Sequence, residues 1–167
     1  MTVNAFLEFF NFENSIQSSE KINYGEIEIP KYALEETVDE PGNKEFNYYS
    51  YNSEEKAYDM RRLYWDEGFF THYLYHFRAS ELCKLLNSGN LYKHILAETR
   101  KANKIIDDCV ALMAQDNSEC QLALKNNDTE HYKKLLNNLR LIVSESVYRN
   151  ICLLYTSPSP RDISGSR

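Results

Sequence analysis

Apolar side chains recur at the spacing of a helix face from about Thr71 to Val147, and this pattern constrains the fold most strongly. Gly89 stands where a left-handed residue ends a helix, and Asn90 can cap the next one. With five Gly and four Pro in 167 residues, a turn-rich β architecture is disfavoured. The first helical stretch, residues 72–90, places these residues on one broad face: Leu74, Phe77, Leu82, Leu85 and Leu86.

Three more helices are predicted after Asn90. One runs from Leu91 to Gln115, and the short connection before it makes it antiparallel to its predecessor. A short helix follows at the capping box Ser118–Gln121, and the last helix begins at Asn127 or Asp128. The inner stripes are Leu91, Ile95, Ala102, Ile105, Ile106, Cys109, Leu112 and Met113 on the long helix, and Tyr132, Leu135, Leu136, Leu139, Ile142, Val143 and Val147 on the last.

The N-terminal part shows less regular structure. Residues 5–17 predict a short helix, "INYGEIEIP" predicts a strand or small hairpin ended by Pro30, and "ALEETVDEPGNKE" predicts an acidic loop with a turn at Pro41-Gly42. The expected fold is therefore mainly α: an antiparallel bundle of three to four helices with a small N-terminal β-hairpin or strand segment. The predicted divisions are an acidic, aromatic-rich segment at 1–70, a helical domain at 71–151 and a non-native tail at 152–167.

The tail prediction rests on "CLLYTSPSPRD". These eleven consecutive residues resemble the conceptual translation of a transposase-type sequencing adapter, and Pro158 and Pro160 interrupt the helical pattern there. We therefore expect residues 152–167 not to belong to the natural protein, whose true C-terminus would be missing.

Charge is distributed unevenly along the chain. Residues 1–70 hold 6 basic and 15 acidic side chains, whereas residues 71–151 hold 11 basic and 9 acidic ones. The N-terminal half would repel a phosphate backbone, and the C-terminal half could tolerate one.

Twelve aromatic residues lie between Phe46 and Phe77. They could form a base-stacking platform or a partner-binding patch. Core packing is the favoured interpretation, because aromatic side chains bury large areas and this segment is acidic.

No set of residues predicts catalysis or a bound cofactor. His72 and His76 have the i, i+4 spacing of two metal ligands on one helix face, but no third ligand is obvious, and two surface histidines are favoured. His94 and His131 are isolated, and the adjacent carboxylates Glu35-Glu36 should diverge. The four scattered cysteines form no C-x-x-C pair, which favours reduced thiols in a cytoplasm. We predict no enzyme, no cofactor and no metal.

The string "NNLR" in the last helix has two interpretations. Mid-helix asparagines are unfavourable, so Asn137, Asn138 and Arg140 suggest either an interhelical hydrogen bond that fixes register or contact with DNA. The structural interpretation is favoured. The candidate interaction or DNA-contact residues are Asn137, Asn138, Arg140, Lys133, Lys134, Arg100, Lys101 and Lys104.

Several short motifs resemble the TnpV family, small proteins encoded on bacterial mobile elements. The matching positions are Arg78, Leu85-Leu86, Ser88-Gly89, Leu91, Met113-Ala114, Leu124-Lys125, Asp128, Tyr132 and Asn137-Asn138-Leu139-Arg140, with "GEIEIP" upstream. The chain departs from the family at Tyr132, where a tryptophan is usual, and residues 42–70 resemble an insertion. The resemblance implies a helical accessory protein of a transposon or conjugative element and brings no catalytic residues.

Two hypotheses for function follow. The first is a non-enzymatic, cytoplasmic protein that binds a protein partner encoded by the mobile element or its host, through the aromatic segment or a helix face. The alternative is a DNA-binding regulator or transposition accessory factor that uses the basic C-terminal helices. No apolar run reaches the length of a membrane span, so no membrane partner is expected.

Overall fold

The computed structural model describes residues 1–38 and 44–156, and it divides into two compact units. The first, here called the sheet unit, comprises Met1–Thr99; the second, the helical unit, begins at Arg100. The boundary falls inside one long helix, α4 (Leu91–Asp116).

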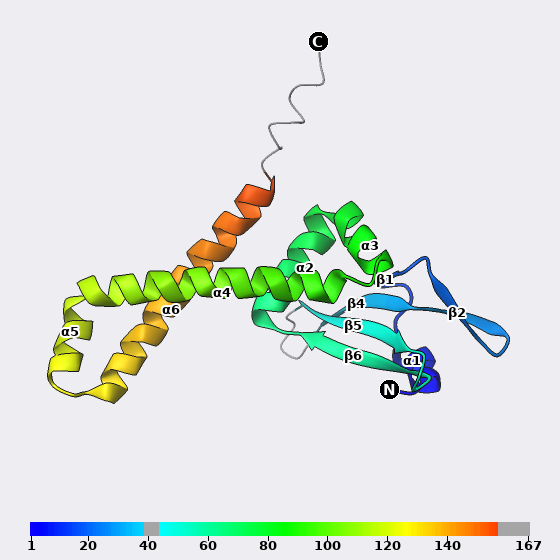
Figure 1. Ribbon diagram of the computed structural model, residues 1–167, viewed down its shortest axis with the longest axis horizontal. Coiled ribbons are helices and arrows are strands. Elements are labelled where there is room, and N and C mark those ends of the chain that lie inside the picture. Colours follow the sequence, from blue (N-terminus) through cyan, green and yellow to red (C-terminus); the bar gives the residue numbers. More distant parts are fainter. Residues whose placement is uncertain (39–43, 157–167) are drawn as a thin grey trace, which may run out of the picture. The chain divides into compact units, whose positions relative to one another are not determined.

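An antiparallel sheet organises the sheet unit (Figure 1). Its strands are β1 (Ser15–Gln17), β4 (Tyr32–Val38), β5 (Lys44–Asn52) and β6 (Ala57–Leu63), in the order β1-β4-β5-β6. A separate hairpin pairs β2 (Lys21–Tyr24) with β3 (Ile27–Pro30) around Gly25, as predicted. The prediction of a mainly α bundle with only a small β segment is wrong, because strands occupy most of the N-terminal half.

Two segments account for that error. Successive side chains of β5, "KEFNYYSYN", point to opposite faces of the sheet. The segment is rich in aromatic residues because both faces of this strand are covered by other elements. Glu35 lies within β4, in a segment predicted to be an acidic loop. Its carboxylate is buried but accepts hydrogen bonds from the Tyr49 hydroxyl at 2.7 Å and the Asn11 backbone N–H at 2.9 Å. The predicted Pro41-Gly42 turn lies outside the described residues.

The two faces of the sheet carry two cores. Helices α2 (Trp65–Phe77) and α3 (Ala79–Asn87) and the start of α4 cover one face, with Leu34, Phe46, Tyr48, Leu63, Leu74, Leu82, Leu86, Leu91 and Ile95 buried together. On the other face, α1 (Val3–Phe9) and the hairpin bury Val3, Phe6, Phe10, Ile29, Ala33, Tyr49 and Tyr58. Burying apolar area on both faces of the sheet stabilises this unit.

Helix boundaries in this unit differ from prediction, and α2 begins at Trp65 rather than near Thr71. The helix predicted for residues 5–17 ends at Phe9, and Ser15–Gln17 pair as β1. The run predicted as one helix over residues 72–90 is broken at Arg78, where the backbone turns to φ −135° and ψ 42°. The helix end at Gly89 is confirmed, with a φ of +68°.

The helical unit contains the rest of α4, together with α5 (Ser118–Lys125) and α6 (Thr129–Thr156). Asn117, rather than Ser118, caps α5 by accepting from the Cys120 N–H at 2.9 Å. The Asp128 carboxylate accepts from the His131 N–H at the start of α6. Arg140 of α6 contacts Asp107 and Asn103 of α4. The predicted interruption at Pro158 and Pro160 lies outside the described residues.

No helix in the described parts of the chain is both long enough and apolar enough to span a bilayer.

Candidate functional site

The helical unit exposes several large apolar side chains on α4, α5 and α6. Leu112 is 63% exposed and Leu141 is 71% exposed. We call the set the exposed apolar residues of the helical unit: Ile105, Leu112 and Met113 on α4, Leu122 and Leu124 on α5, and Leu141 and Ile142 on α6. Where such side chains lie together, they are typical of a surface that another protein covers.

Four of these residues were predicted to be internal. Ile105, Leu112 and Met113 belong to the inner stripe predicted for α4, and Ile142 to that of α6. That assignment is wrong, because the unit buries a narrower set: Ala102, Ile106, Val110, Ala114, Cys120, Ala123, Leu139, Val143 and Tyr148. Apolar spacing predicts a helix face that is suited to burial, but it does not show whether residues of the same chain or of another molecule bury it.

A cavity of about 310 Å³ adjoins this surface at the end of α5. It is lined by Glu119, Leu122, Ala123, Asn126, Asp128 and His131. Leu122 therefore belongs both to the exposed apolar residues and to a concave site. A hollow with an apolar wall can receive a side chain of a binding partner.

The predicted DNA-contact residues are all on the surface of the helical unit, but some have partners there. Arg140 pairs with Asp107, and its guanidinium donates to the Asn103 side-chain oxygen at 3.4 Å. Lys134 pairs with Glu130 at 3.0 Å, one turn earlier on α6.

The remaining members of that set are exposed. Asn137 and Asn138 are exposed on α6, so the interhelical contact predicted for "NNLR" is made by Arg140 instead. Lys101 is also exposed. Arg100, Lys104 and Lys133 are exposed and form no ion pair with the described residues.

Core packing accounts for most of the aromatic segment. Phe46, Tyr48, Tyr49, Tyr58, Phe70 and Tyr73 are buried. The interpretation of these residues as packing is confirmed, whereas Tyr64, Phe69 and Phe77 are exposed. A partner surface built on the whole segment is therefore not available.

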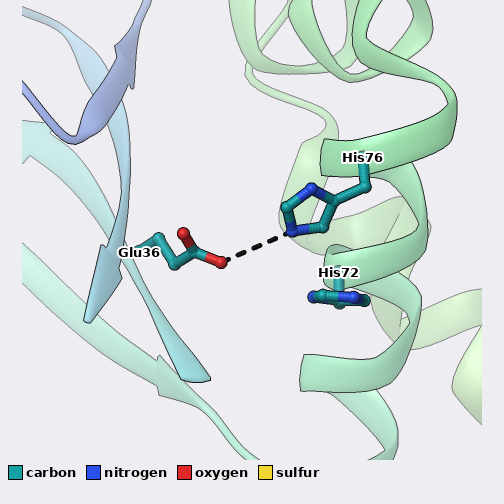
Figure 2. A group of neighbouring side chains, drawn as sticks. All are labelled: Glu36, His72 and His76. Atoms are coloured by element: carbon teal, nitrogen blue, oxygen red, sulfur yellow. Dashed lines mark ion pairs between the residues drawn. The ribbon is translucent and has the colours of Figure 1, made fainter. Parts of the chain in front are cut away.

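A separate cluster lies between the sheet and α2. The side chains of Glu36, His72 and His76 each offer a ligand atom, and these atoms lie within 4.8 Å of one another. Figure 2 shows the two imidazoles one turn apart on α2 and the carboxylate reaching toward them from the strand. The Glu36 Oε1 atom is 3.5 Å from His76 Nε2 and 3.1 Å from Lys44 Nζ.

Backbone geometry explains why this cluster forms. Glu36 follows Leu34 by two residues in β4, so both side chains point to the face covered by α2, whereas Glu35 points to the other face. His72 and His76 share one side of α2 because they are four residues apart. The sequence alone indicated that His72 and His76 share a helix face. It did not indicate that Glu36, in a segment predicted to be a loop, would lie beside them.

The surroundings favour neutral imidazole at His72. Partial burial of the ring lowers the pKa of His72, whose side chain is otherwise exposed, and the neighbouring His76 lowers it further. The Glu36 Oε1 atom is buried, and neither contact has the geometry of a hydrogen bond. Neutral imidazole nitrogens and a carboxylate oxygen are ligands for divalent metal ions.

The free thiols do not contribute to this cluster. Among the described side chains, Cys83, Cys109 and Cys120 are free thiols, and Cys120 is buried in the helical unit. None of them joins Glu36, His72 and His76 in the described part of the chain.

Comparison with known proteins gives no relative: no protein-family model, curated protein or solved structure matches this chain.

Proposed function

We propose that this protein acts by binding another protein, and that the exposed apolar residues of the helical unit form the binding surface. The single observation that carries the proposal is their exposure, above all that of Leu112 and Leu141. Leaving such side chains in water forgoes roughly 1.5–3 kcal/mol each relative to burial, so a partner that covers them gains binding energy.

The partner that suits this surface presents an apolar helix face flanked by acidic residues. Ile105 and Leu112 are seven residues apart, so their side chains lie two turns apart on the same face of α4. The exposed cations Arg100, Lys104 and Lys133 would meet acidic flanks and quicken association at low salt. The resemblance to TnpV proteins suggests a partner encoded by a mobile element or by its bacterial host, with this protein as a non-enzymatic accessory in the cytoplasm.

DNA binding is the alternative, and it has less support. Arg140 and Lys134 each pair with an acidic side chain of the same unit, which reduces the charge available to phosphate groups. Asp108 and Asp116 add negative charge along α4.

Affinity capture with a matched pair of variants tests the proposal. The apolar variant replaces Leu112 and Leu141 by Gln; the control replaces the exposed polar residues Gln115 and Glu145 by Ala. Circular dichroism first establishes that both variants fold as the full-length parent does. A captured protein is then purified and its affinity measured by calorimetry.

The proposal predicts one defined partner whose affinity falls at least tenfold with the apolar variant and stays within about twofold with the control. If the partner bound the parent and the apolar variant with equal affinity, the exposed apolar residues would not be its binding surface. Absence of any protein partner, together with salt-dependent DNA binding, would favour the alternative.

A further inference from the structure

Glu36, His72 and His76 offer the donor set of a three-ligand metal centre. Two imidazoles and one carboxylate recur in zinc sites that keep a fourth position for water. The chain brings these donors together across the interface between β4 and α2, within the sheet unit. They belong to a different part of the chain from the proposed protein-binding surface.

The spacing of the donor atoms is close to that needed around an ion. Two ligand atoms bound tetrahedrally to Zn²⁺ lie about 3.3 Å apart, given Zn–N and Zn–O bonds of about 2.0–2.1 Å. The contact between Glu36 Oε1 and His76 Nε2 is 3.5 Å, so this edge of the site is already formed. The remaining donor atoms lie within 4.8 Å, and side-chain rotation of the exposed His72 can shorten that distance.

Lys44 is the competitor for the carboxylate. Its Nζ lies 3.1 Å from Glu36 Oε1, but its side chain is 52% exposed and flexible. A divalent ion interacts with the carboxylate more strongly than an ammonium does, and Lys44 can turn into water when it is displaced. The buried carboxylate oxygen, which accepts no hydrogen bond from the residues that the structure describes, gains a bond when a metal binds.

We propose that Glu36, His72 and His76 bind one Zn²⁺ ion, with water completing its coordination, and that the ion ties α2 to the sheet. Because a metal centre with three protein ligands and imidazole donors favours first-row transition ions, Co²⁺ should occupy the same site and Mg²⁺ should not. The site differs from the sequence-based prediction of two surface histidines, because the third ligand comes from a distant strand.

Calorimetric titration of the full chain with Zn²⁺, after chelation and buffer exchange, tests the proposal. We expect one ion per chain with a dissociation constant of about 10 µM or tighter. The variants H72N, H76N and E36Q should each weaken binding by at least about tenfold, since each removes one ligand. Zn²⁺ should raise the unfolding midpoint of the parent, and Mg²⁺ should leave it unchanged.

A double variant at the other two histidines, H94N/H131N, is the matched control, and it should bind Zn²⁺ as the parent does. Titration with Co²⁺ should give visible absorption bands that are absent from H72N and H76N. Failure of the parent to bind Zn²⁺ below about 100 µM would overturn the proposal. So would unchanged binding in H72N and H76N, which would place the ion elsewhere, or unchanged binding in E36Q, which would remove the carboxylate from the site.

Discussion

Tyr32 lies directly against Gly89, so that a Cβ atom added to the glycine would be 2.6 Å from the Tyr32 hydroxyl oxygen. The same glycine ends α3 with a φ of +68°. These two demands, a left-handed backbone and a close approach, explain why glycine is needed where the chain turns from α3 into α4.

Gly89→Ala should therefore destabilise the sheet unit by about 1–3 kcal/mol, through backbone strain and displacement of Tyr32. Gly25→Ala is the matched control, because Gly25 has a φ of +63° but no neighbour within 4 Å of an added Cβ. Chemical unfolding of both variants should show the larger loss at Gly89. An equal loss in the two variants would contradict a role for the Tyr32 contact.

Tyr49→Phe should destabilise the sheet unit by about 1–3 kcal/mol, because it removes a donor to the buried Glu35 carboxylate. Tyr51→Phe, two residues away on the same strand, should cost less, since the Tyr51 hydroxyl makes no hydrogen bond to the described residues. Urea unfolding measures both. A Tyr49→Phe variant as stable as the parent would show that the Asn11 N–H and water suffice for Glu35.

Alkaline pH should destabilise the sheet unit. Burial raises the pKa of Tyr48 from 10.0 to about 12, and burial likewise raises the pKa values of Tyr49 and Tyr58. Between pH 10 and pH 12, the unfolded chain loses the Tyr48 proton while the folded chain retains it. The contribution of Tyr48 to stability is therefore fully present below pH 10 and is lost as the pH rises from 10 toward 12, by at most about 1.4 kcal/mol per pH unit. Tyr49 and Tyr58 act in the same direction.

Unfolding free energy measured across that interval checks this expectation, with Tyr48→Phe as the comparison. The variant should show a shallower loss of stability with pH, because one of the titrating groups is absent. Parallel curves for the parent and Tyr48→Phe would mean that Tyr48 titrates normally in the folded protein.

A salt series of fluorescence anisotropy against labelled duplex DNA separates the two functional hypotheses. We expect weak binding to the parent and little change in K133A/K134A, a variant that leaves the Arg140–Asp107 pair intact. Tight binding that weakens steeply with salt, with a slope that falls by about two in the double variant, would instead support the DNA-binding alternative.

Two local signals in the sequence predicted local structure correctly. Gly89 marked a helix end and "INYGEIEIP" marked a hairpin, because each depends on a few neighbouring residues. Long-range pairing was not accessible in the same way. Strand β4 carries Glu35 and Glu36, which disfavour a strand by composition, and it forms because β1 and β5 pair with it and because Tyr49 satisfies Glu35.

The same limit applies to the candidate sites. The His72 and His76 pair is visible from i, i+4 spacing, but Glu36 joins it only through the packing of α2 on the sheet. Leu112 and Ile142 match the apolar spacing of buried helix positions, yet the helical unit leaves them exposed. Apolar spacing therefore predicted an inner face at these positions, and it could not show which of them the fold buries.

Site-specific photocrosslinking in bacterial cells tests the central claim, that the exposed apolar residues bind a protein, most directly. A photoreactive amino acid replaces Leu112 or Leu141 in turn, with Gln115 and Glu145 as control positions on the same helices. The account predicts a covalent adduct with one defined protein from positions 112 and 141 and little or none from the controls. No adduct at either apolar position, or equal adducts at all four positions, would contradict it.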